Sequence, residues 1–192
     1  TLPTGASFID NGDGTGDFTW TPDFTQAGTY DITFTASDGS ATDDELVTIT
    51  ISDAGNQAPE LTAIGAQGTT EGVLLAFSVS ATDPDGTFPA LTTSTLPTGA
   101  SFTDNGDGTG DFTWTPDYTQ VGAYDITFTA SDGGLTDDEL VTITVVDAGN
   151  QAPELAPIGA QSGTENALLT FSVSASDPDG TIPSLTTSTL PT

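Results

Sequence analysis

The chain has no positively charged side chain. Its 192 residues contain no lysine, arginine or histidine against 28 aspartates and glutamates, which gives a formal net charge of −28. Average usage would place roughly two dozen lysines and arginines in a chain of this length. No salt bridge between side chains can therefore form, and dissolved ions or bound metal must neutralise the carboxylates. Nucleic acids and anionic membrane surfaces are excluded as partners, because binding either one needs basic side chains.

Cysteine and methionine are absent as well, which excludes disulfides, thiolate nucleophiles and sulfur ligands for metals. Because histidine is also missing, the common imidazole base and the usual ligands of zinc, copper and haem iron are absent. Oxygen donors remain, and these favour hard cations such as calcium. No apolar run reaches the length of a membrane-spanning helix, so we expect no membrane insertion in this segment.

The most informative feature that is present is a repeat with a period of 94 residues. The phrase TLPTGASF begins at Thr1 and again at Thr95, and TLPT returns at residues 189–192. Positions one period apart differ at 18 of 94 places, so about four in five are identical. A repeating unit of this size is a domain rather than one turn of a solenoid. The chain is therefore an array of tandem domains.

Each period contains short strands and no helical pattern. Apolar and polar residues alternate through residues 75–81, 124–131 and 141–145, and Phe112 and Trp114 form an aromatic pair before a proline. Alternation with period two is typical of half-buried strands. With the stretches 61–64 and 91–96 this predicts about seven strands per repeat. The predicted fold is all-β, a tandem array of seven-stranded antiparallel β-sandwich modules.

The segment DAGNQAP, at residues 53–59 and again at 147–153, follows a long strand and combines glycine with proline. It is the best candidate for the linker between modules. Residues 56–149 then form one complete module, residues 1–55 the C-terminal part of a preceding module, and residues 150–192 the N-terminal part of a further one.

Two interpretations of this organisation stay open. The chain can be an excerpt of a longer array, in which neighbouring sequence completes the outer modules. Alternatively, the incomplete ends of separate copies complete each other head to tail, a heterologous contact that does not close and so builds a fibre.

Three sequence motifs carry a family resemblance. The strand YDITFTASDGG at 124–134 is similar to the alternating cadherin strand that ends in A-x-D-x-G, and VSATDPDG at 79–86 and VSASDPDG at 173–180 are similar to the cadherin A-x-D-x-D segment. The linker DAGNQAP is similar to D-x-N-D-N-A-P. The complete module thus resembles the cadherin-like and immunoglobulin-like tandem repeats of large bacterial surface proteins of the adhesin type.

This resemblance implies calcium ions at the junctions between modules, where they would stiffen the array. It implies ten metal ligands. At the first junction these are Asp53, Asn56, Asp83, Asp85 and Asp132; at the second they are Glu71, Asp147, Asn150, Asp177 and Asp179. The linker is less acidic than its cadherin counterpart, so one or two ions per junction are expected rather than a cluster of three.

General chemistry supports the same ligands less specifically. Calcium takes six to eight oxygen ligands, and D-x-D spacing places two carboxylates on one side of an extended segment. The competing interpretation is that Asp-Pro-Asp-Gly is only a turn, for which its composition is well suited.

Two other acidic segments have simpler explanations. The segment from Asp104 to Asp111 lacks the glutamate of an EF-hand loop, because Pro116 stands at the last ligand position. Its asparagine and glycines predict a tight hairpin instead. The acidic run at residues 137–139 is interpreted as a solvated, charged strand start that discourages edge-to-edge aggregation.

We expect no enzymatic activity, because the repeated carboxylates lie mostly in turns and no pocket with a perturbed acid is indicated. Trp114 is expected in the core, with a sugar-stacking platform as the alternative. The predicted function is a calcium-stiffened extracellular or cell-surface stalk of an adhesin or matrix protein. Its partners would be neighbouring repeats of the same protein. A head-to-tail fibre and a glycan-binding module are the alternatives.

Overall fold

The computed structural model describes residues 1–188, and the closing TLPT at 189–192, where the repeat begins a third time, lies outside them. In the described residues every regular element is a β-strand. No helix in this part of the chain is long and apolar enough to cross a membrane. The expectation of an all-β fold is confirmed.

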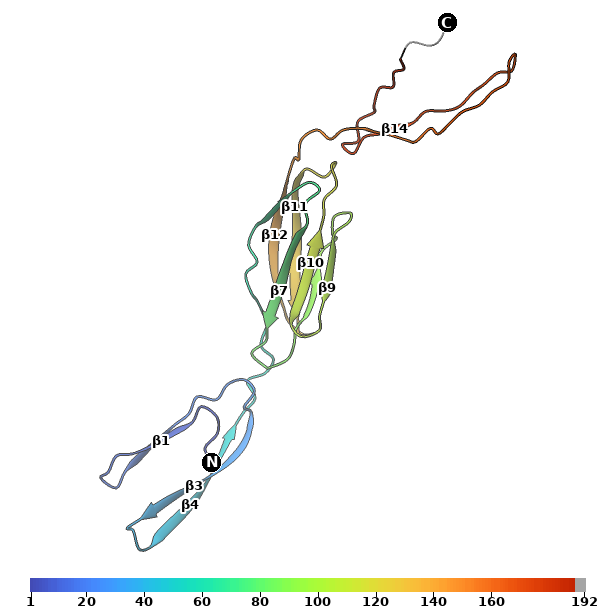
Figure 1. The fold of residues 1–192 in the computed structure, drawn as a ribbon. Helices are drawn as coiled ribbons and strands as arrows, with labels where there is room; N and C mark the ends of the chain where they lie inside the picture. Colours follow the sequence, from blue (N-terminus) through green and yellow to red (C-terminus); the bar gives the residue numbers. More distant parts are fainter. Residues whose placement is uncertain (189–192) are drawn as a thin grey trace.

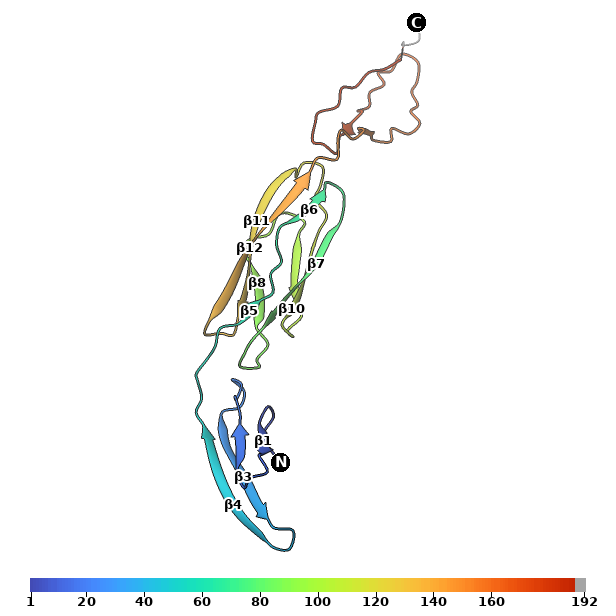
Figure 2. The ribbon, with the colours of Figure 1, turned by 90° about the vertical axis from the view of Figure 1, so that its left-hand side faces the viewer.

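Residues 60–146 form a two-layered β-sandwich, here called the central sandwich. One sheet has the strand order β5-β7-β10-β9 and the other β6-β12-β11-β8. The strands are β5 (Glu60–Leu61), β6 (Gln67–Thr70), β7 (Leu75–Thr82), β8 (Ala90–Thr93), β9 (Ser101–Asp104), β10 (Thr109–Trp114), β11 (Gly122–Ser131) and β12 (Thr136–Val146). The predicted antiparallel sandwich is therefore present, and both layers are visible edge-on in Figure 2.

The sandwich has eight strands rather than seven because its first strand is divided between the two sheets. β5 pairs with β7 antiparallel, whereas β6 pairs with β12 parallel. Between them the chain bends at Gly65, whose φ of 69° is in the left-handed region. A glycine adopts that conformation at little cost. The bend carries the chain from one sheet to the other before β7 begins.

The core lies between the two sheets and comes from the inward side of each alternating strand. Phe112 and Trp114 of β10, Phe128 of β11 and Ile143 of β12 are at most 1% exposed. The rings of Phe112 and Phe128 meet edge to face with centroids 6.1 Å apart. Such packing can stabilise a module of this size, and it confirms Trp114 as a core residue.

Residues 1–52, here called the N-terminal segment, contain two hairpins with the registers of the central sandwich. Strands β1 (Ser7–Asp10) and β2 (Gly16–Thr19) form one two-stranded sheet, and β3 (Gly28–Ser37) and β4 (Thr42–Ile51) form another. The pair Ser7↔Thr19 recurs as Ser101↔Thr113 one period later. The repeat in sequence is therefore a repeat in structure.

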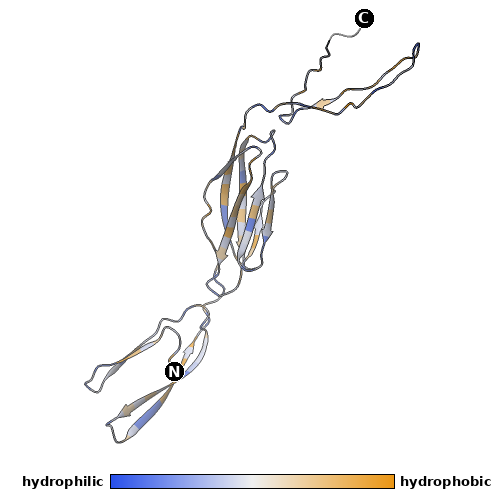
Figure 3. Cartoon of the chain, viewed as in Figure 1, coloured by the Kyte–Doolittle hydropathy of each residue, from blue (hydrophilic) through white to orange (hydrophobic). Residues whose placement is uncertain are grey.

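Residues 150–188, the C-terminal segment, contain only a short ladder of β13 (Glu154–Leu155) and β14 (Ala175–Ser176). The N-terminal and C-terminal segments lie at opposite ends of the central sandwich, and the whole chain is elongated (Figure 1). Figure 3 shows apolar residues recurring along the strands of the N-terminal segment and of the central sandwich.

Candidate functional site

The first linker is held by hydrogen bonds to loops of the central sandwich. The backbone N–H of Gln57 donates to Asp85 Oδ2 at 2.6 Å, and Asn56 Nδ2 donates to Asp132 Oδ2 at 2.8 Å. Asp53 instead accepts from Gly55 N within the linker, at 2.9 Å. Three of the five predicted residues of this junction, Asn56, Asp85 and Asp132, thus take part in contacts between the linker and the sandwich, whereas Asp53 binds within its own linker.

The Asp-Pro-Asp-Gly segment forms a turn, as its composition suggests. Asp83 Oδ1 accepts from the N–H of Asp85 at 2.8 Å, and the N–H of Gly86 returns to the carbonyl of Asp83 at 3.0 Å. Gly86 has a φ of 80°. The other carboxylate oxygen, Asp83 Oδ2, is buried and has no hydrogen-bond partner. The turn therefore uses only one of the two carboxylate oxygens of Asp83, and the other oxygen has no donor.

The second junction repeats part of the first. Gln151 N donates to Asp179 Oδ2 at 2.6 Å, and Asp179 N donates to Asp177 Oδ1 at 2.9 Å. Asp147 Oδ1 accepts from Gly149 N at 2.7 Å. Asn150 Nδ2 donates to the neighbouring carbonyl of Gln151 and contacts no carboxylate.

Glu71 is the one buried charged or polar residue within residues 1–188, with 4% of its surface exposed. It lies after β6 at the end of the central sandwich that faces the second linker. Its N–H donates to the carbonyl of Val146 at 3.0 Å, and its Oε2 accepts from Ala148 N at 3.3 Å. Its Oε1 is buried without a partner. An ionised carboxylate in this position is under-satisfied.

The ten predicted ligands do not converge on one point at either junction. Within residues 1–188, no group of three or more Asp and Glu side chains is arranged to hold a metal ion. Backbone amides are the main partners of these carboxylates. The N–H of Leu135 first, then the N–H of Gly134 and the Asn56 side chain, hold the pKa of Asp132 below its ordinary value. In the described geometry the junctions are therefore hydrogen-bonded loops.

The acidic run at residues 137–139 has a role that its composition did not indicate. Asp137 Oδ2 accepts from Leu61 N at 2.8 Å, while Glu139 accepts from Ile64 N and Gly65 N with one oxygen each, both at 2.8 Å. The interpretation of these two residues as solvated charges was wrong: they fix the bend between β5 and β6. The alternation of β12 could have predicted this role, because Asp137 and Glu139 lie on the same inward side of the strand as Val141.

The acidic segment after β9 is the predicted hairpin. Gly106 N donates to Asp104 Oδ1 at 2.9 Å, Thr109 N donates to Asp107 Oδ1 at 3.0 Å, and Gly106 and Gly108 have positive φ. These contacts satisfy the carboxylates without a metal. Trp114 is 1% exposed and its Nε1 donates to the carbonyl of Thr98 at 3.2 Å, so it offers no face for sugar stacking.

Comparison with known families agrees with this architecture. A family model described as "Putative Ig domain" matches residues 1–52 and 58–146, which is most of the chain. The chain belongs to this immunoglobulin-like family. The two matches are one repeat apart, so the expectation of tandem Ig-like repeats is confirmed.

The chain is similar to parts of several longer proteins. Chitinase A of Pseudoalteromonas piscicida is 29% identical over 133 residues, which make up 69% of this chain and 16% of that protein. The endo-fucoidan hydrolase MfFcnA4 of glycoside hydrolase family 107 gives a TM-score of 0.46 at 22% identity, covering 80% of this chain and 24% of that one. The SrpA adhesin of Streptococcus sanguinis gives 0.42 at 13% identity, covering 52% and 63%. The chain spans only a sixth to a quarter of the first two proteins.

Proposed function

We propose that this chain is a non-catalytic spacer: a stretch of extracellular Ig-like repeats that holds other parts of a larger protein apart. The observation that carries the proposal is the recurrence of one junction. Gln57 N to Asp85 and Gln151 N to Asp179 have the same length of 2.6 Å. A junction that repeats its contacts repeats its geometry, and repeated geometry produces an extended array.

A contact between modules recurs along with these hydrogen bonds. A Cβ placed on Gly86 would lie 3.1 Å from the methyl group of Thr25 in the preceding module, and one on Gly180 would lie 3.3 Å from that of Thr119. The Asp-Pro-Asp-Gly turn of one module thus rests against the loop before β3 or β11 of the preceding module. This close approach favours glycine at the tip of the Asp-Pro-Asp-Gly turn and limits bending at the junction.

The charge of the chain supports the same function. A formal charge of −28, with no basic side chain to offset it, makes neighbouring arrays repel one another and favours solubility. Among residues 1–188 the carboxylates serve mainly as acceptors for backbone N–H groups in turns and linkers, which is a structural use. The absence of lysine and arginine also removes the cleavage sites of tryptic proteases, an advantage outside the cell.

The spacer proposal predicts an elongated particle whose junctions stiffen it. A compact protein of 192 residues would have a radius of gyration of about 16 Å, and we expect small-angle X-ray scattering to give well over that value. Asp85→Ala should lower it, because the linker loses its hydrogen bond at Gln57 N. Asp125→Ala is the matched control, since Asp125 binds only the Thr142 hydroxyl on the outer face. A compact particle, or equal effects of both variants, would contradict the spacer function.

We further propose that calcium binds weakly at the junctions. The two buried carboxylate oxygens without partners, Glu71 Oε1 and Asp83 Oδ2, both belong to the predicted ligand set. Both belong to the central sandwich: Asp83 lies at the first junction and Glu71 at the second, so each junction contains one such oxygen. A hard cation would supply the missing partner of each, with Asp147, Asp177 and Asp179 as further oxygen donors at the second junction. The ion would contribute charge neutralisation between modules.

Calcium should then stabilise the chain in a Glu71-dependent way. With a dissociation constant of about 1 mM, as in extracellular modules, 10 mM calcium would add about 1.4 kcal/mol to the free energy of unfolding. Thermal unfolding of the full chain in calcium, magnesium or chelator measures this effect. Glu71→Gln should abolish most of the calcium increment, whereas Asp125→Asn should leave it intact. Identical curves in calcium and chelator would refute the calcium site and leave the spacer function standing.

A further inference from the structure

The hairpin between β9 and β10 contains the dipeptide Asn105-Gly106, and the same dipeptide occurs one period earlier as Asn11-Gly12. An asparagine that precedes glycine loses its side-chain amide more readily than other asparagines, because glycine has no side chain to hinder attack by its own nitrogen. Asn105 and Gly106 are both exposed, so water reaches them. The hairpin is therefore a candidate for spontaneous chemical modification.

The reaction takes place within the dipeptide. The Gly106 nitrogen gives up its proton to a base in solution and attacks Cγ of Asn105. A bond from this nitrogen to Cγ forms, the bond from Cγ to Nδ2 breaks, and Nδ2 leaves as ammonia after taking a proton from water. Water then hydrolyses the five-membered succinimide ring and leaves aspartate or isoaspartate at position 105. Water is thus the only co-reactant.

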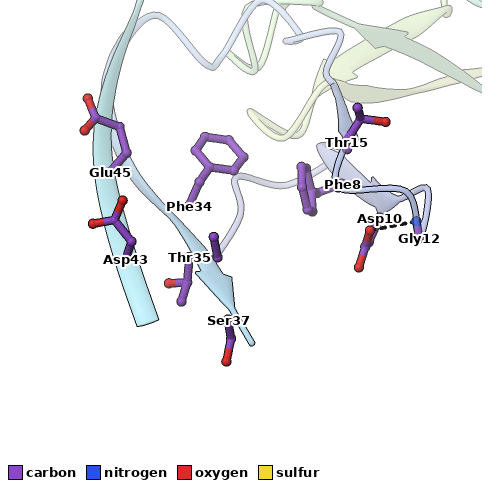
Figure 4. Close-up of a pocket in the computed structure, with 12 residues that line it drawn as sticks. Phe8, Asp10, Gly12, Thr15, Phe34, Thr35, Ser37, Asp43 and Glu45 are labelled. Atoms are coloured by element: carbon purple, nitrogen blue, oxygen red, sulfur yellow. Dashed lines mark hydrogen bonds between the residues drawn. The ribbon is translucent and has the colours of Figure 1, made fainter. Parts of the chain in front are cut away.

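In the folded hairpin the attacking nitrogen is occupied. Gly106 N donates to Asp104 Oδ1 at 2.9 Å. Gly12 N donates to Asp10 Oδ1 at the same distance, and a dashed line marks this bond in Figure 4. The attack requires the nitrogen without its proton. A carboxylate at hydrogen-bond distance opposes the loss of that proton, because it would place two negative charges side by side.

The side-chain amide that would be attacked is held as well. Asn105 Nδ2 donates to Thr109 Oγ1 at 3.0 Å and to Asp111 Oδ2 at 3.3 Å, and Asn105 N donates to the carbonyl of Thr109 at 2.9 Å. Asn11 makes the corresponding side-chain contacts one period earlier, at 3.0 and 3.2 Å. Rotation of the Asn105 side chain towards the Gly106 nitrogen breaks the Nδ2 contacts, so ring closure requires the hairpin to open first.

The hairpin is also tied to the rest of the central sandwich. Ala81 N donates to the carbonyl of Gly108 at 2.8 Å, and Leu91 N donates to Asp104 Oδ2 at 3.1 Å. Gly108 is buried, and a Cβ placed on it would lie 2.7 Å from the carbonyl oxygen of Ala81. Opening of the hairpin therefore breaks contacts with β7 and β8, which couples the reactivity of Asn105 to the unfolding of the module.

The products do not fit the hairpin that the asparagine formed. Aspartate places a carboxylate next to Asp111, where Asn105 Nδ2 donates a hydrogen bond in the unmodified chain. Isoaspartate also lengthens the main chain by one methylene group and shifts the pairing of residue 105 with Thr109. A modified module therefore cannot regain the original hairpin.

We propose that Asn105, and Asn11 at the same place in the preceding repeat, are deamidation sites that the folded hairpin blocks and that unfolding opens. A deamidated asparagine at this position then marks a repeat that has unfolded. The proposal rests on contacts within one module, and it does not depend on the spacer function.

Peptide mapping after incubation of the full chain at mildly alkaline pH tests this proposal. Brief chymotryptic digestion after phenylalanine separates residues 9–18 from residues 103–112, which differ only at Ile9 and Thr103 and contain one asparagine each. Mass spectrometry then gives the deamidated fraction. In denaturant, Asn105 should deamidate about tenfold faster or more, the factor that corresponds to losing one hydrogen bond to a charged group. Asn56 and Asn150 precede glutamine and should react slowly in both states.

Two variants test the contacts of the amide in the folded chain. Thr109→Val and Asp111→Ala each remove one acceptor of Asn105 Nδ2, so each should accelerate deamidation at Asn105 and leave Asn11 at its original rate. Asp125→Ala, on the outer face, is the matched control and should change neither rate. Far-UV circular dichroism verifies that each variant is folded.

The comparison with the denatured chain needs no variant. Equal rates at Asn105 in the folded and the denatured chain would overturn the proposal, as would a denatured chain in which Asn105 reacts no faster than Asn56. Unchanged rates in both folded variants would also overturn it, because the contacts of the amide would then provide no protection.

Discussion

Replacing Trp114 with alanine is expected to lower the free energy of unfolding of the central sandwich by about 3 to 5 kcal/mol. The indole is 1% exposed and meets Tyr124 edge to face, with ring centroids 4.9 Å apart. Its removal leaves a cavity between the sheets and removes one of the two donors to the carbonyl of Thr98, the other being Gln120 Nε2. Chemical denaturation followed by far-UV circular dichroism measures the loss.

The repeat supplies a matched control for this variant. Trp20 makes the same contacts in the N-terminal segment: its Nε1 donates to the carbonyl of Thr4, and its ring meets Tyr30 at 4.7 Å. It lacks an opposing half of the sandwich, so Trp20→Ala should cost the central sandwich nothing measurable. Equal losses in the two variants would mean that burial between the sheets is not what makes Trp114 important.

The second large effect is expected for Glu139→Ala, which removes both acceptors that hold the bend between β5 and β6. A hydrogen bond to a charged group contributes about 1.5 to 3 kcal/mol, so the loss should be about 3 kcal/mol or more. Amide hydrogen exchange at Ile64 and Gly65 should accelerate together. Glu139→Gln keeps one carbonyl oxygen and should lose roughly half as much.

Glu45 is the control at the equivalent position of the N-terminal segment. It is exposed there and lines a hollow beside Phe8 and Phe34 (Figure 4). Glu45→Ala in dilute solution should leave the unfolding of the central sandwich unchanged. If Glu139→Ala also leaves the free energy of unfolding of the central sandwich unchanged, the Glu139 carboxylate does not stabilise the bend. The acidic run would then contribute no more than a solvated charge.

Much of the fold was predictable because alternation is a local property. A strand with one buried face needs apolar side chains at every second position. Residues 75–81, 124–131 and 141–145 can therefore be recognised as strands from the sequence alone. The hairpin after Asp104 was predictable for a similar reason: its glycines at positions 106 and 108 permit the positive φ that the turn requires.

The division of the first strand was not predictable in the same way. The strand β6 contains Gln67, Gly68, Thr69 and Thr70, a polar stretch with no alternation to mark it. It is a strand because β12 offers it a parallel partner and because Glu139 turns the chain towards that partner. Both causes lie far away in the sequence.

The candidate site illustrates the same limit. Composition restricts any ligand to oxygen donors, and the cadherin resemblance named the carboxylates that surround the linkers. Which partner each carboxylate takes depends on the packing of loops. Asp85 and Asp179 bind linker amides, Asp53 and Asp147 bind their own turns, and Glu71 keeps one oxygen without a partner.

The sequence by itself determined that this protein is an array, that each unit is a β-sandwich of the Ig type, and that no basic side chain takes part in holding it together. These properties follow from period, alternation and composition, which every segment carries locally. The tertiary structure decided where the first strand changes sheets and which carboxylates bind the backbone amides of distant segments. Those depend on contacts between residues far apart in sequence, and only a folded chain brings them together.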